Sequence, residues 1–139
     1  MVPLMSYDIY LLGAPCSACG HEAEQPELPD PTYNLTRIFH LALTNEPMPS
    51  PEVGSMEEVV LGKPVNAPRG LCCLNGARAG DTTERLRAAI RNITNPARYA
   101  EFDVLKPSNG WGTLEGATEV LKELLDAAER YPDYVWDIR

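Results

Sequence analysis

Four cysteines and two histidines are the side chains in this sequence best suited to bind a metal ion. The stretch PCSACGH holds two of the cysteines three residues apart, a spacing that brings two thiolates within reach of one tetrahedral ion. A structural zinc site takes four ligands, so a third thiolate and an imidazole have to join them. The sequence therefore predicts a structural zinc site at Cys16, Cys19, Cys72 and His21, with Cys73 and His40 as alternative donors.

Two other interpretations of the cysteines stay open. Cys72 and Cys73 lie in an apolar run, where cysteine often acts as a small buried hydrophobic residue, and the pair at 16 and 19 is then an empty thiol pair. Redox chemistry is the third interpretation, although no helix start follows Cys16 to lower the pKa of its thiol. If the vicinal pair lies in an extended segment, its side chains point to opposite faces and only one of them can join a metal.

Two polar stretches, each of which opens a predicted helix, form a second candidate site. They read TYN at 32–34 and NGWGT at 109–113. Free N–H groups at helix starts carry partial positive charge, asparagine amides form hydrogen bonds, and a tryptophan ring supplies an apolar wall. If both helices pack on the same sheet face, the two starts meet and bind a small ligand through Tyr33, Asn34, Asn109 and Trp111. The alternative is that Thr32 or Asn34 caps the first helix and Trp111 fills the core.

The charge of the chain is unevenly distributed. The net charge is −8, yet six arginines fall between positions 69 and 98. Arg87 and Arg91 stand four residues apart on a predicted helix, so we expect one exposed basic spot that binds an anionic partner. The alternative is that these arginines pair with the protein's own acids. The overall acidity argues against general nucleic-acid binding, which needs cations to neutralise phosphates.

Few residues suit catalysis. The stretch GARAGDTTER from Gly76 lacks the spacing and the lysine of a phosphate-binding loop, and it predicts a glycine turn with Asp81 or Thr82 capping the next helix. An imidazole base has to be His21 or His40. No nucleophilic side chain stands at a sequence spacing from either histidine that would indicate a catalytic pair. These observations favour a protein that is not an enzyme.

Periodic patterns predict two strands and three helices. SYDIYLL at 6–12 and the alternating residues 134–138 are typical of strands. Apolar spacing predicts helices from Asn34 onward, over about 81–93 and over 113–130, and a capping box predicts a single turn at 55–58. We expect an α+β fold in which a small antiparallel sheet, including the N- and C-terminal strands, packs with about three helices.

The length suits a single domain over residues 1–139. A cysteine-containing, proline-rich excursion is expected at about 13–31 and a proline-rich loop at about 45–54. No apolar run approaches the roughly 18 residues of a membrane helix, and the N-terminus lacks the features of a signal peptide. A cytoplasmic location without a membrane partner is therefore expected.

Three stretches together resemble a known family: MSYDIYL at 5–11, TYNLTRIF at 32–39 and NGWGTLEGA at 109–117. Their order and spacing are similar to those of an uncharacterised family of small proteins found in bacteriophage and actinobacterial genomes. The resemblance covers most of the chain from Met5 to Ile138. It implies the fold and a phage or mobile-element setting, with the host cell cytoplasm as the location, and it brings no known activity.

Three functional hypotheses follow. The first is a non-enzymatic phage or mobile-element accessory protein that binds a host protein or a small ligand. The second is a small nucleotide- or anion-binding domain, or an enzyme, that uses the Asn/Gly/Trp and arginine surfaces. The third is a virion-associated structural protein whose acidic surface packs in an assembly.

Overall fold

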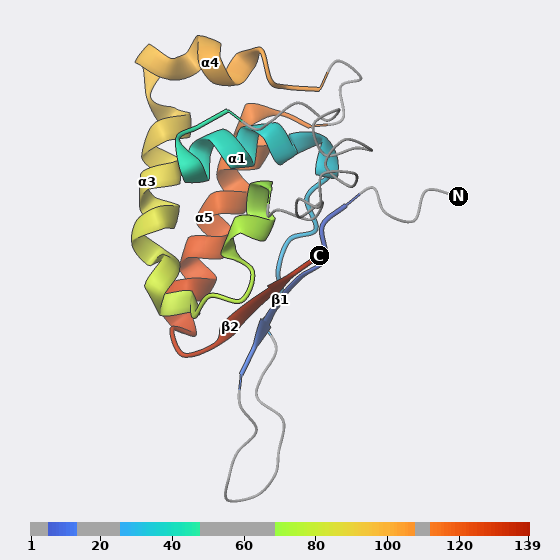
Figure 1. Ribbon diagram of the computed structural model, residues 1–139, viewed down its shortest axis with the longest axis vertical. Coiled ribbons are helices and arrows are strands. Elements are labelled where there is room, and N and C mark those ends of the chain that lie inside the picture. Colours follow the sequence, from blue (N-terminus) through green and yellow to red (C-terminus); the bar gives the residue numbers. More distant parts are fainter. Residues whose placement is uncertain (1–5, 14–25, 48–68, 108–111) are drawn as a thin grey trace, which may run out of the picture.

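Two short strands from opposite ends of the chain pair with each other and lie against a group of helices (Figure 1). The computed structural model describes residues 6–13, 26–47, 69–107 and 112–139. Strands β1 (Ile9–Leu12) and β2 (Val135–Ile138) are antiparallel, with Ile9 opposite Ile138 and Leu12 opposite Val135. The predicted α+β fold, with a sheet made from the two terminal strands, is confirmed.

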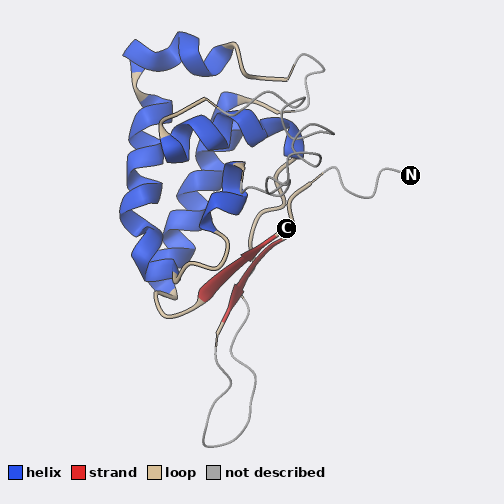
Figure 2. Ribbon diagram, in the orientation of Figure 1, coloured by secondary structure: helices blue, strands red, loops and turns tan. Residues whose placement is uncertain are grey.

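The helices lie together on one side of the two strands (Figure 2). The three predicted helices are confirmed as α1 (Thr36–Thr44), α3 (Thr83–Thr94) and α5 (Leu114–Arg130). The described ranges also hold α4 (Tyr99–Asp103) and the 3₁₀ turns η1 (Tyr33–Leu35), η3 (Gly70–Leu74), η4 (Ala79–Thr82) and η5 (Pro96–Arg98). Elements this short show too little of a period to be predicted. The turn expected at 55–58 lies outside the described residues.

The core lies between the helices and the inner face of the strands. Successive side chains of a strand point to opposite faces, so Ile9 and Leu11 are buried while Tyr10 and Leu12 are exposed. Helix α5 carries an apolar stripe at helical spacing, and that stripe is buried where α5 packs against α3, η4 and α1. Its buried members are Leu114, Ala117, Val120, Leu121, Leu124, Ala127 and Ala128.

Trp136 ties strand β2 to the start of α3. Its side chain is 1% exposed, and its indole Nε1–H donates to Thr82 Oγ1 at 2.9 Å. The Thr82 hydroxyl in turn donates to the Ala79 carbonyl at 2.7 Å. Thr82 stands at the N-cap position of α3 but makes no side-chain capping bond, so the prediction that Asp81 or Thr82 caps this helix is wrong. The Thr82 hydroxyl instead accepts the hydrogen bond of the buried Trp136 indole.

The segment before α3 runs beside β2 and extends the sheet without forming a regular strand. Gly76 N–H donates to the Trp136 carbonyl at 2.9 Å, and Ala79 N–H donates to the Tyr134 carbonyl at 2.7 Å. On the other side of the sheet, Tyr7 N–H donates to the Pro31 carbonyl at 2.8 Å. The two paired strands therefore have a further length of chain on each edge.

Threonine hydroxyls start two of the helical segments. Thr32 Oγ1 accepts from Asn34 N–H at 3.2 Å, and Thr113 Oγ1 accepts from Gly116 N–H at 2.9 Å. Of the two residues proposed to cap the first helical segment, Thr32 is therefore the one that does so. Asn34 lies within the 3₁₀ turn η1, which leads directly into α1.

Gly70 marks the closest approach between η3, α1 and the segment before β1. Its φ is +57°, and a Cβ atom built at this position would lie 2.5 Å from Tyr7 Oη and 2.8 Å from Thr36 Cγ2. The Tyr7 hydroxyl is held there by Thr36 Oγ1 at 2.7 Å. Only glycine fits such a position, because any side chain would push apart two elements that are themselves hydrogen-bonded.

We predict that Gly70→Ala destabilises the protein by about 3 kcal/mol, since left-handed backbone strain adds to overpacking. Gly76→Ala is the matched control: its φ is +82°, but a Cβ there would meet nothing within 4 Å. Gly76→Ala should lower the free energy of unfolding by roughly 1–2 kcal/mol, the cost of placing a non-glycine residue in the left-handed backbone conformation. Urea unfolding of both variants measures the difference, and equal losses would contradict the close packing at Gly70.

Candidate functional site

The starts of α1 and α5 lie together, as the second candidate site requires (Figure 1). A Cβ atom built at Gly112, just before α5, would lie 2.7 Å from Leu35 Cδ2 and 3.4 Å from Pro107 Cγ. The φ of Gly112 is +140°, so glycine suits this position by both conformation and space. We call the residues Asn34, Leu35, Pro107, Gly112 and Thr113 the helix-start junction. Asn109 and Trp111 lie outside the described residues.

Asn34, the residue before Leu35, carries an unsatisfied polar atom. Its Nδ2 is buried, and within the described ranges no acceptor lies within hydrogen-bonding distance of it. A buried amide without a partner costs about 1–3 kcal/mol in lost hydration, and such groups are rare in native proteins. An oxygen acceptor from a bound molecule would satisfy this group.

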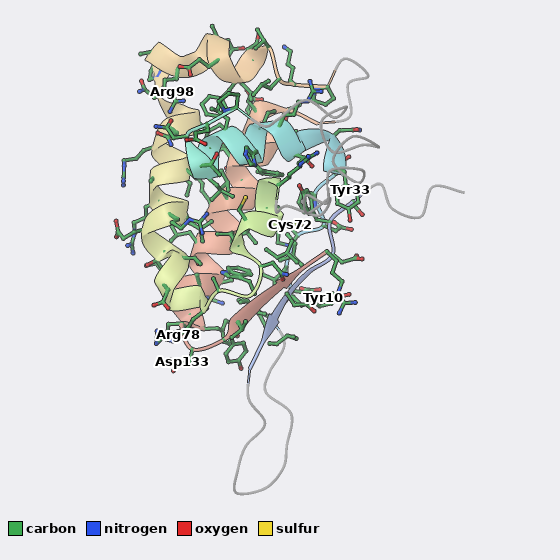
Figure 3. The ribbon with its side chains drawn as sticks, in the orientation of Figure 1. Tyr10, Tyr33, Cys72, Arg78, Arg98 and Asp133 are labelled. Atoms are coloured by element: carbon green, nitrogen blue, oxygen red, sulfur yellow. The ribbon has the colours of Figure 1, made fainter. Side chains whose placement is uncertain are left out.

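Tyr33, the neighbouring predicted ligand residue, is used by the fold. Its hydroxyl donates to the Arg139 carbonyl at 2.9 Å, and its ring packs edge-on against Tyr7 at a centroid distance of 4.6 Å. Figure 3 shows Tyr33 close to Cys72 and the end of β2. Burial raises the pKa of Tyr33, with a smaller contribution from Cys72. Tyr33 therefore holds the C-terminal strand and is not available as a ligand residue without releasing it.

The vicinal cysteines lie in the 3₁₀ turn η3, not in the extended segment that the sequence suggested. Their thiols still go to different partners: Cys72 Sγ donates to the Ile138 carbonyl at 3.8 Å, while Cys73 Sγ lies 3.9 Å from His40 Nδ1. Both thiols are half-buried, and burial raises the pKa of each. Raised pKa values keep both cysteines protonated at neutral pH, which does not favour nucleophilic chemistry.

His40 is buried beside η3. Its Nδ1 accepts a hydrogen bond from Gly70 N–H at 3.2 Å, so the proton of the neutral imidazole lies on Nε2. Burial lowers the pKa of His40, and the charge of Arg69 lowers it further, while Glu46 acts in the opposite direction. The sequence offered His40 as a metal donor or an imidazole base, and this structural bond could not be predicted, because nothing in the sequence places Gly70 against α1.

The structure brings two of the proposed metal donors together. The separation of 3.9 Å between Cys73 Sγ and His40 Nδ1 is close to the roughly 3.5 Å expected for two ligands of a tetrahedral zinc ion. Among the described residues, no three His, Cys, Asp or Glu side chains gather in a way that could hold a metal. Cys16, Cys19 and His21 lie outside the described residues, so a complete zinc site stays a prediction.

If the zinc prediction is correct, protein purified without chelators contains a stoichiometric amount of zinc and loses thermal stability when the zinc is removed, because metal binding is coupled to folding. Cys16→Ser and Cys19→Ser should each lose the metal. The third thiolate is Cys72 in the first donor set and Cys73 in the alternative set with His40, so loss of the metal in Cys72→Ser supports the first set and loss in Cys73→Ser supports the alternative, in which Cys73 is the thiol beside His40. Elemental analysis of each variant provides the measurement, and wild-type protein free of zinc would contradict the prediction.

One of the two arginines predicted to form an exposed basic spot on α3, Arg87, is paired with acids of the protein. Arg87 Nη1 donates to Glu84 at 2.5 Å and Nη2 donates to Glu129 of α5 at 3.3 Å. The hydrogen bond to Glu84 is the main cause of the raised pKa of Arg87. Arg91 is exposed, and no ion pair to it is recorded among the described residues. The alternative, that these arginines pair with the protein's own acids, holds for Arg87.

A shallow groove of about 920 Å³ runs between residues 26–29 and the second half of α5. Pro26, Leu28 and Tyr131 are among its lining residues. Its two cations pair with acids on their own helix: Lys122 with Glu119 at 3.7 Å and Arg130 with Asp126 at 3.4 Å. None of the predicted ligand residues lines this groove.

The outer face of the two strands carries exposed apolar side chains that sequence reasoning did not select. Tyr10 and Leu12 are each 43% exposed, and Val135 is 39% exposed. Leu12 and Val135 stand opposite each other, and Tyr10 is on the same face two residues away (Figure 3). We call these three residues the outer strand patch. The apolar residues at alternate positions of SYDIYLL were the signal that could have revealed it.

Comparison with protein-family models, with curated proteins and with solved structures finds no match for this chain. The described part of the chain contains no helix with the length and apolar character needed to cross a membrane. The function therefore has to be argued from the geometry.

Proposed function

We propose that this protein is a non-catalytic accessory protein, of the phage or mobile-element kind, that binds a small molecule at the helix-start junction. The observation that carries the proposal is the buried Nδ2 of Asn34, which has no acceptor among the described residues. The bound molecule supplies that acceptor as a carbonyl, carboxylate or phosphate oxygen.

The surroundings of Asn34 suit such a ligand. Leu35, the next residue along the chain, and Pro107 are apolar side chains that both lie close to Gly112. The junction lies at the start of α5, a helix of 17 residues whose N-terminal N–H groups carry partial positive charge. Apolar walls with one or two placed polar groups are typical of small-molecule sites. Asn109 and Trp111, which flank the junction in the sequence, are predicted to complete it.

The chemistry at this site is binding and not catalysis. His40, which the sequence offers as an imidazole base, accepts a hydrogen bond from Gly70 N–H and lies beside the Cys73 thiol. An asparagine amide neither transfers a proton nor acts as a nucleophile at neutral pH. The junction can therefore hold and orient an oxygen acceptor, which is what a binding protein requires.

We predict that native mass spectrometry of protein purified from cells shows a retained ligand, and that Asn34→Asp and Asn34→Leu both lose it while still folded. Asp removes the donor and adds a negative charge, whereas Leu removes the polar group. In ligand-free protein Asn34→Leu should be no less stable than wild type, because it relieves a buried unsatisfied amide worth about 1–3 kcal/mol.

Asn92→Leu is the matched control for this experiment. Asn92 Nδ2 donates to the Ala42 carbonyl at 3.0 Å, so its loss should reduce stability and leave ligand binding unchanged. The proposal is wrong if wild-type protein carries no ligand and Asn34→Leu is as destabilising as Asn92→Leu, since Asn34 would then be an ordinary structural residue.

A second candidate function is protein binding through the outer strand patch. Three apolar side chains lie together on one face, and Asp8 shares that face. The nearby cations are neutralised within the protein: Arg78 pairs with Asp133 at 2.8 Å and Arg139 pairs with Asp137 at 3.2 Å. With a net charge of −8, the face suits a partner whose apolar contact is surrounded by lysine or arginine.

A photocrosslinking amino acid placed at Tyr10 tests this second function in cells, with the same group at Tyr99 of α4 as the control. Tyr99 is 57% exposed but lies outside the patch. We expect a discrete crosslinked protein from position 10 only, and binding of that purified protein should weaken at least about tenfold in Leu12→Lys and fall as salt rises. Crosslinks that are the same from both positions, or that are absent, would contradict a docking role.

A further inference from the structure

The groove between residues 26–29 and the second half of α5 is a concave surface that neither candidate function uses. Leu28 packs against the core and so fixes one wall to the rest of the protein. On the other wall, the ring of Tyr131 is held by Tyr134 at a centroid distance of 4.9 Å. Apolar residues line the groove from both walls, and they are Pro26, Leu28, Pro29, Ala127 and Tyr131.

The charges of the lining are not balanced. Its two cations each pair with a carboxylate of α5. Glu27 of one wall and Glu123 of the other are exposed, and no ion pair to either is recorded among the described residues. Within the described part of the chain, each wall therefore contributes one carboxylate that no cation of the protein neutralises. The net charge of −8 adds to the attraction of a cationic ligand.

The carboxylates lie along the groove and do not surround one point. Glu27, Glu123 and Asp126 all line it, yet no three acidic, histidine or cysteine side chains in the described ranges gather in a way that could hold a metal. A single divalent cation is therefore a poor match for this geometry. Separated negative charges between apolar side chains suit a ligand whose own cationic groups are separated by apolar groups.

The length of the groove suits a short stretch of extended peptide. Lys122 and Arg130 line its α5 wall eight positions apart, which corresponds to about 12 Å at a rise of about 1.5 Å per residue. An extended chain covers this length in about four residues. Because alternate side chains of an extended chain point to opposite faces, two of the four face the groove and two face solvent. A shallow groove can hold such a chain without enclosing it.

We propose that this groove binds an extended segment of a partner protein in which arginine stands beside leucine or proline. The cationic group binds at Glu27 and Glu123, and the apolar neighbour packs on Leu28 and Tyr131. A guanidinium also stacks on an aromatic ring more readily than an ammonium group does, so Tyr131 favours arginine over lysine. The site is separate from the helix-start junction, and the proposal does not depend on a ligand being bound there.

An array of immobilised peptides, with four central positions that vary among arginine, leucine, proline and glutamate, tests the proposal against the full chain. We expect the bound peptides to carry arginine beside leucine or proline and to lack glutamate. In solution, Glu27→Lys and Glu123→Lys should each weaken the best of these peptides at least about tenfold, because charge reversal replaces attraction with repulsion. Glu46→Lys is the matched control, since Glu46 is exposed, lies outside the groove and changes the net charge equally.

Amide NMR of the wild-type protein supplies the second measurement, and it does not depend on any variant folding. Addition of the best array peptide should shift the resonances of residues 26–29 and 122–131 and leave those of α1 unchanged. The proposal is wrong if no array peptide binds, if the shifts fall outside the groove, or if Glu46→Lys weakens binding as much as the groove variants do. It is also wrong if a linear polyamine binds as tightly as the best peptide, because the ligand is then a small amine.

Discussion

The burial of Trp136 is the interaction on which the arrangement of the two ends of the chain depends. Its indole bonds to Thr82 at the start of α3, and its backbone pairs with β1 on one side and with residues 76 and 77 on the other. A tryptophan buried this deeply needs a partner for its N–H, and Thr82 is held in place for that role by its own bond to Ala79. Trp136 therefore connects the two strands, residues 76 and 77 and the start of α3.

Two surfaces of the folded chain are available for the candidate functions. Because the inner faces of β1 and β2 close over the core, Tyr10, Leu12 and Val135 face outward. The residues before α5 lie against η1, where the Nδ2 atom of Asn34 is buried without a partner among the described residues. Each candidate binding surface combines segments that are far apart in the sequence, so neither belongs to a single local motif.

Regular elements were predictable because their signals are local. The alternation in SYDIYLL gave β1, and the apolar spacing of α3 and α5 gave two helices within a few residues of their observed bounds. Thr82 was misassigned as a cap because its partner, Trp136, lies 54 residues away. The short η3 turn was missed for the same kind of reason: Gly70 and its neighbours are helical only where they meet α1 and Tyr7.

The candidate site was predictable in part. The meeting of the two helix starts followed from placing both helices on one side of a small sheet, and the contact of Gly112 with Leu35 agrees with it. The roles of individual side chains were harder to predict, because they depend on distant partners. The Tyr33 hydroxyl donates to the Arg139 carbonyl, and Arg87 pairs with the carboxylates of Glu84 and Glu129. Side chains selected for ligands by type alone were thus already used by the fold.

The side-chain amide of Asn34 reports most directly on the central claim, that its buried Nδ2 donates to an oxygen of a bound molecule. Amide NMR resonances of Asn34 can be compared between protein as purified and protein that was unfolded, dialysed and refolded without its ligand. The account predicts a hydrogen-bonded, slowly exchanging Asn34 amide in the purified protein, and a shifted, faster-exchanging one after refolding, with the amide of Asn92 unchanged. Identical Asn34 resonances in the two samples would contradict it.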